Sequence, residues 1–159
     1  MTAPIPIRIR DVLIGRLETI RQAAGFNTDL GLAIYPGRGG YALQDVTDCP
    51  RANVYAAGEA PRDFSGNQQR IEREFAIEAF SAYADDADAV AELLLADIKA
   101  AVFIADQPRL ADAAGQLTQK LEYVSAAIDL PTPGEQMVSV TVTVRCTYFE
   151  RYGAPTLTA

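Results

Sequence analysis

The chain has no histidine among its 159 residues. Histidine is the usual general base near neutral pH, the usual partner of a catalytic serine and the commonest zinc ligand. Two lone cysteines, Cys49 and Cys146, do not make a zinc site without further ligands, and we expect both thiols to be reduced. The absence of histidine therefore predicts that the protein is not an enzyme, with no catalytic residue, no metal and no cofactor.

Long apolar runs are missing as well. No run approaches the length of about 18 residues that a membrane helix needs. The first seven residues lack the basic start and the long apolar stretch of a signal peptide. These absences predict synthesis in the cytoplasm.

Positive charge is also in short supply. There are 14 Lys and Arg residues against 21 Asp and Glu residues, which gives a formal net charge of −7. An acidic surface repels phosphates, so binding of nucleic acid by simple electrostatics is disfavoured. The charge is compatible with a protein that borders a DNA passage without gripping the DNA, and equally with solubility alone.

What is present is ordinary globular composition, with 49% hydrophobic and 22% charged residues. The length fits one domain with a real core. We therefore predict a single domain over residues 1–159, with an ordered core at about residues 7–152. The segment after it, residues 153–159, is predicted to be a loose tail.

Helical periodicity occurs twice. Residues 7–24 place Ile9, Leu13 and Leu17 on one side, with Pro6 in the first turn and Gly25 as a stop. Residues 86–105 carry a second apolar stripe of Val90, Leu93, Leu94, Ile98, Ala101 and Val102. Aspartates 85, 86 and 88 precede that stripe and lack the glycine and the closing glutamate of a calcium loop, so they are interpreted as helix caps.

Strand patterns fill the rest. The most regular is residues 136–150, where valines from Val138 to Val144 alternate with serine, threonine and arginine. A Gly-rich turn at residues 36–40 lacks the Lys-Ser/Thr ending of a P-loop, and residues 41–50 are predicted to be irregular. The other predicted strands are residues 30–35, 52–57, 69–82 and 117–128.

The order of these segments predicts an α+β fold in which an antiparallel β-sheet carries two α-helices on one face, in two layers. Turn-forming residues at 58–67 separate two of the strands and make a connector longer than an ordinary hairpin loop. We interpret it as an exposed arm that contacts a partner. The candidate interface residues of the arm are Glu59, Pro61, Arg62, Asp63, Phe64 and Arg70.

Three carboxylates, Glu72, Glu74 and Glu78, alternate with apolar residues on one strand and should share the wet face of the sheet. Paired carboxylates serve as acid and base only when a neighbour separates their pKa values, and no aromatic cleft accompanies these. They are interpreted as a solvated or interface face.

In order and style, the segments resemble the small tail terminator (tail completion) proteins of long-tailed bacteriophages. The resemblance covers about residues 7–152 and rests on pattern and length, with no signature motif. The segments that carry it are IRDVLIGRL (9–17), RANVY (51–55), RIEREFAIEA (70–79), LLLADIKAA (93–101) and the Val-rich strand that ends at Tyr148.

The resemblance implies a ring, usually of six subunits, at the head-proximal end of the tail tube in the virion. Such a ring ends tube polymerisation, presents a surface to a head-completion or neck protein and lets DNA pass without specific binding. The implied partners are other copies of the chain, the tail tube protein and the neck protein. The glutamate-bearing face is a candidate lumen wall. The alternatives are a head–tail connector or neck adaptor, a tail tube subunit, and a small ligand-binding domain.

Overall fold

The computed structural model describes residues 3–37, 49–83 and 85–158. Its helices are α1 (Ile5–Leu17) and α2 (Ala87–Val102), with two 3-10 turns, η1 (Gln22–Ala24) and η2 (Leu30–Leu32). Its strands are β1 (Ile34–Pro36), β2 (Arg51–Ser65), β3 (Gln68–Ala82), β4 (Ala111–Asp112), β5 (Gly115–Gln116), β6 (Lys120–Asp129), β7 (Met137–Arg151) and β8 (Ala154–Thr158).

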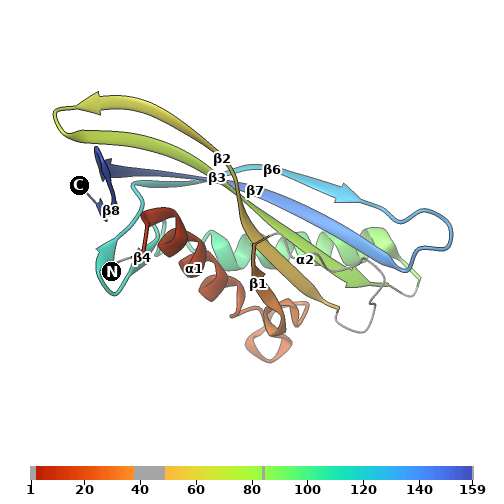
Figure 1. Cartoon of the computed structure of the whole chain (residues 1–159). Coiled ribbons are helices and arrows are strands. Elements are labelled where there is room, and N and C mark those ends of the chain that lie inside the picture. The colour runs from red at the N-terminus through yellow and green to blue at the C-terminus, as the bar shows by residue number, and fades with distance from the viewer. Residues whose placement is uncertain (1–2, 38–48, 84, 159) are drawn as a thin grey trace.

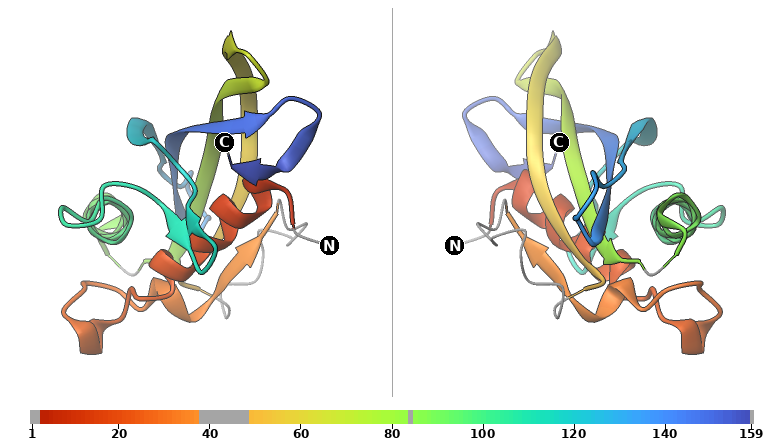
Figure 2. Two further views of the ribbon diagram at one scale, coloured as in Figure 1. Left: turned by 90° about the vertical axis from the view of Figure 1, so that its left-hand side faces the viewer. Right: turned by 90° about the vertical axis from the view of Figure 1, so that its right-hand side faces the viewer.

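The main sheet has the strand order β1-β2-β3-β7-β6, and β8 pairs with the far end of β7. All of its pairs are antiparallel except the short parallel contact between β1 and β2. Both helices lie against the same face of the sheet (Figures 1 and 2). The predicted two-layer α+β fold is confirmed.

The centre of the sheet is the long pairing of β3 with β7, which runs without a register shift from Gln68 opposite Arg151 to Ala82 opposite Met137. The predicted alternation holds along β7 as far as Tyr148, since every even position from Val138 to Tyr148 is buried. Each large apolar side chain of this kind contributes about 1.5–3 kcal/mol when it is fully buried. This face, with the apolar sides of both helices, forms the core.

Helix α2 begins as predicted. The Asp86 side chain accepts a hydrogen bond of 3.0 Å from the backbone N–H of Ala89, which is the role of an N-cap. Leu94 and Ile98 of the predicted stripe are fully buried, whereas Leu93 is exposed and Leu95 is buried in its place. The stripe is therefore rotated by a fraction of a turn from its predicted centre.

Helix α1 ends at Leu17, earlier than the predicted end at residue 24. The chain bends there because Gly31 passes across the helix end and donates its N–H to the carbonyl of Ile20 at 3.0 Å. A Cβ on Gly31 would lie 2.7 Å from the carbonyl oxygens of Leu17, Glu18 and Ile20. Only glycine fits, and this contact between residues far apart along the chain has no periodic signal.

Two buried charged side chains, one on each helix, form hydrogen bonds to neighbouring loops. The Asp97 carboxylate on α2 accepts four hydrogen bonds, from the backbone N–H and side chain of Asn27 and from those of Thr28, at 2.7–3.0 Å. The Arg16 guanidinium on α1 donates to the carbonyl oxygens of Val102, Gln107 and Arg109 at 2.6–2.9 Å. Both residues therefore serve the scaffold, and burial lowers the pKa of Arg16.

Several boundaries differ from the predictions. In place of the strand predicted at residues 30–35, residues 30–36 form a 3-10 turn and a three-residue strand, because the chain must first bring Gly31 to the end of α1. Residues 154–158, predicted to be a loose tail, form β8, which pairs with β7 through residues such as Thr158 opposite Glu150. Strand β6 begins three residues later than predicted. The predictions for residues 38–48 lie outside the described part of the chain.

Candidate assembly surface

The predicted arm exists, but it is a β-ribbon and not a loop. Strands β2 and β3 stay paired to Ser65 opposite Gln68, and a two-residue turn closes the ribbon with Gly66 at φ +63°. Two register shifts interrupt the ladder, one before Gly58 and one after Pro61. The prediction of a turn throughout 58–67 was wrong because an edge strand accommodates glycine and proline at bulges.

This ribbon projects beyond the helical layer (Figure 1). We call residues 58–70 the arm. Beyond Val54, β2 pairs only with β3 among the described strands, so one long side of the arm is a free strand edge. Residues 61–68 are exposed throughout. On the other side of the arm, β3 stays paired with the end of β7 up to Gln68 opposite Arg151. The free edge of β2 therefore presents both backbone hydrogen-bonding groups and side chains to a partner.

The charged candidates of the arm are paired across the ribbon. Arg62 lies 2.9 Å from Glu72, and Arg70 lies 2.7 Å from Asp63. Glu59 forms an ion pair with Arg73, a residue that the sequence analysis did not single out. Exposed pairs of this type contribute only about 0.2–1 kcal/mol each, so they set the register of the ribbon more than they stabilise the fold.

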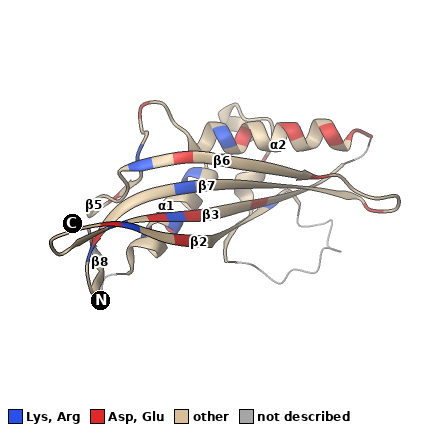
Figure 3. Cartoon of the chain, turned by 90° about the horizontal axis from the view of Figure 1, so that it is seen from above, with Lys and Arg blue, Asp and Glu red and all other residues tan. Residues whose placement is uncertain are grey.

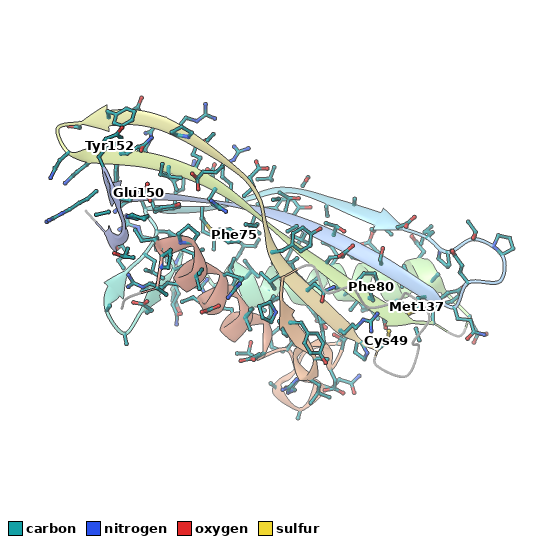
Figure 4. All side chains as sticks on the ribbon, viewed as in Figure 1. Cys49, Phe75, Phe80, Met137, Glu150 and Tyr152 are labelled. Atoms are coloured by element: carbon teal, nitrogen blue, oxygen red, sulfur yellow. The ribbon has the colours of Figure 1, made fainter. Side chains whose placement is uncertain are left out.

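The tip of the arm carries an exposed aromatic pair. The rings of Phe64 and Tyr152 meet edge to face with centroids 5.6 Å apart, and the side chains are 61% and 70% exposed. Tyr152 also donates its backbone N–H to the carbonyl of Asn67 at 2.8 Å. Figure 4 places Tyr152 at the tip. Aromatic side chains left in water on a held scaffold are the residue types that most often anchor protein interfaces.

We call the sheet face opposite the helices the outer face. The three predicted glutamates lie on it, because they pair with Thr147, Arg145 and Thr141, which alternate with the buried even positions of β7. Figure 3 shows acidic and basic positions along the neighbouring strands β3, β7 and β6. The three glutamates are not a row of free carboxylates. Glu72 is paired with Arg62, and Glu74 lies 2.6 Å from Arg145 on β7. Glu78 makes no ion pair with another described residue. The cross-strand arginines neutralise part of the acidity that the alternation predicted.

The pairing has an electrostatic consequence at Arg145. The hydrogen bond to Glu74 raises the pKa of Arg145, and desolvation of the guanidinium lowers it by a smaller amount. The negative charges of Glu74, Glu72 and Glu122 raise the pKa further. Glu122 lies on β6 directly opposite Arg145. Lys120 in turn contacts Glu122 at 2.6 Å, so the charges of both signs form a ladder across the strands of the outer face.

The inner side of the arm's base holds a group of polar side chains that sequence reasoning did not bring together. Tyr148 is fully buried opposite Ile71, and burial together with the charge of Glu59 raises its pKa. Burial and Glu59 also raise the pKa of Glu150, while Arg73 opposes this increase. The alternation over residues 136–150 predicts that Glu150 lies on the same side of β7 as Tyr148. That alternation was the only feature of the sequence that pointed to this position.

Within residues 3–37, 49–83 and 85–158, no group of three or more histidine, cysteine, aspartate or glutamate side chains is placed to hold a metal ion. The thiol of Cys49 is half-buried and donates to the sulfur of Met137 at 3.5 Å, and Cys146 is buried. In the described part of the chain, neither α1 nor α2 has the length and apolarity of a membrane-spanning helix.

No protein-family model matches the chain, and no curated protein matches it in sequence. Among solved structures, a chain of the structure described as "Virion of native gene transfer agent (GTA) particle" is similar to this chain in backbone structure. The two chains are 17% identical over 91% of this chain and 90% of that chain, with a TM-score of 0.48. A likeness at this level leaves partners and role to be argued from the surface of this chain itself.

Proposed function

We propose that the chain is a structural subunit of a phage-like virion that works by assembling with other proteins and not by catalysis. The observation that carries the proposal is the arm, a β-ribbon with a free edge and an exposed aromatic tip on an otherwise compact two-layer scaffold. Ordering such a projection has a conformational cost without a buried core to offset it, so a contact with a partner is its natural use.

The finer proposal is a tail terminator, which is the role that the sequence resemblance implies. A closed ring needs two different faces on each subunit, because the contacts are head to tail. Among the described strands, the sheet has two unpaired edges on opposite sides, the arm portion of β2 and the whole of β6. Strand β6 exposes Tyr123 and Val124. The subunit therefore has the two unlike edges that a closed ring requires. Six copies is the ring size that the resemblance implies.

The outer face is the candidate lining of the central passage. Arg62 and Arg145 of this face are engaged by Glu72 and Glu74, so neither is a free cation that grips phosphates. With the formal charge of −7, this surface suits a passage through which DNA slides. In this proposal the ring sits at the head-proximal end of the tail, between the tail tube protein and a neck protein.

Electron microscopy of the purified protein mixed with tail tubes tests the proposal. A terminator forms discrete rings on one end of each tube and stops further elongation. Long tubes made of this chain alone would identify a tube subunit instead, and density at the portal side of the neck would identify a neck adaptor. A protein that stays monomeric and leaves the tube ends bare would contradict an assembly role at this place.

A further inference from the structure

A cavity of about 500 Å³ lies at the end of the sheet opposite the arm, between the end of β6 and the start of β7. Phe80, Leu130, Pro131 and Met137 supply its apolar lining, and Leu130 is 49% exposed. Figure 4 shows Phe80 and Met137 at this end and Tyr152 at the other. We call this cavity the socket.

The charge of the socket is negative. Asp129 and Glu135 line it, and no lysine or arginine does so among the described residues. At the arm tip, Arg151 is exposed and makes no ion pair with a described residue, whereas Arg62 and Arg70 are already paired. The arm tip and the socket are therefore complementary in charge.

They are complementary in apolar surface as well. Phe64 and Tyr152 are held together at the tip with both rings exposed. Pockets of about 300–1,000 Å³ bury ligands of drug size, and two aromatic rings are no larger than such a ligand. Because tip and socket occupy opposite ends of one subunit, joining them between two copies makes a heterologous, head-to-tail contact that can close into a ring.

We propose that the aromatic tip of the arm occupies the socket of a second copy of this chain, with Arg151 beside Asp129 and Glu135. The inference rests on the proposed function in one respect, namely that the arm is an assembly element, and it adds which surface receives the arm. One junction buries little area, so a single contact is weak and the closed ring supplies the stability.

A complementation experiment isolates one junction. Phe64→Ser removes the tip and keeps the socket, whereas Leu130→Arg blocks the socket and keeps the tip. Each variant alone is expected to be monomeric, and an equimolar mixture is expected to give a one-to-one dimer and nothing larger. Leu93→Arg, at an exposed leucine on α2, is the matched control and assembles like the wild type.

Isotope-labelled Phe64→Ser protein titrated with unlabelled Leu130→Arg protein detects the contact even at a Kd on the order of 1 mM. The expected result is a set of shifted NMR signals around Leu130, Met137 and Phe80. The absence of shifts at these residues would overturn the inference. A Leu130→Arg protein that assembles normally, while Phe64→Ser does not, would also overturn it but would leave the arm as an assembly element. Normal assembly of both variants would overturn the inference and the proposed use of the arm together.

Discussion

The ring of Phe64, near the end of β2, packs edge to face on the ring of Tyr152, which follows β7 by a single residue, with centroids 5.6 Å apart. This contact joins the arm tip to the C-terminal strand pair. Two held rings that remain mostly in water do little for the fold. Their placement is the clearest indication in this structure of a surface made for a partner.

Tyr152→Ser separates folding from assembly. The exposed aromatic contact is worth about 0.5–1.5 kcal/mol, so the free energy of unfolding should fall by no more than that amount. Assembly should weaken by about 10-fold or more, as expected for loss of an interface anchor. Leu32→Ser is the matched control, because Leu32 is also 70% exposed and lies away from the arm. Urea titration and sedimentation give the two readouts, and equal assembly of both variants would count against the anchor.

Gly31 and Gly15 make an opposed pair for a test of the fold. Gly31→Ala should destabilise the protein by about 3 kcal/mol, because its Cβ would meet three backbone carbonyl oxygens at 2.7 Å. Gly15→Ala, within α1 and with open space around it, should stabilise the protein by about 0.5–1 kcal/mol. Thermal unfolding measures the stability of both variants. Similar changes in Tm for the two variants would show that the contact of Gly31 with the end of α1 leaves room for a Cβ.

The four hydrogen bonds on Asp97 predict a large effect of one substitution. Asp97→Ala leaves the donors of Asn27 and Thr28 without their acceptor in a partly buried site, which should lower the free energy of unfolding by about 3 kcal/mol. Glu92→Ala, exposed on the same helix, should change it little. Comparable losses in the two variants, measured by urea denaturation, would refute the role of Asp97 as the fastener of α2.

Glu150 predicts a dependence on pH. Burial and the charge of Glu59 raise the pKa of this carboxyl in the folded protein above its ordinary value, so the folded chain holds the proton more tightly than the unfolded chain. Stability at this site is therefore greatest when the carboxyl is protonated, and it falls as the pH rises through the folded pKa.

Glu150→Gln keeps the site neutral at every pH. Its free energy of unfolding, relative to that of the wild type, should increase from about pH 4 to about pH 7. Glu92→Gln should show no such trend. A constant difference across the range, measured by urea titration at each pH, would show that the site is not desolvated as described.

How far the sequence predicts this molecule depends on whether the signal is local. Alternation from Val138 to Tyr148 and the cap at Asp86 are local, and both are confirmed. The end of α1 depends on Gly31, which arrives from a later segment, and the tail forms β8 only because β7 offers it an edge. Hydrophobic periodicity and secondary-structure propensity describe neighbouring residues, so they predict neither of these two contacts.

The candidate site shows the same division. Its residues were found because turn-formers and alternating glutamates mark an exposed hairpin, but the ribbon itself was hidden by Gly58 and Pro61. Those residues look like a loop until the edge position of β2 is known. The partners Arg73 and Arg145 come from neighbouring strands, so the pairing of the glutamates follows only from the register.

The most direct test is the mass in solution of the wild type and of a protein with a trimmed arm. Residues 62–70 are replaced by Asn-Gly, so that a two-residue turn joins the register partners Pro61 and Ile71. Sedimentation equilibrium should give a closed ring for the wild type and a folded monomer for the trimmed protein. The thermal stability of the trimmed protein should be lower, because the pairing of residues 68–70 with β7 and the contact of Phe64 with Tyr152 are lost. Equal masses for the two proteins, whether rings or monomers, would contradict assembly through the arm.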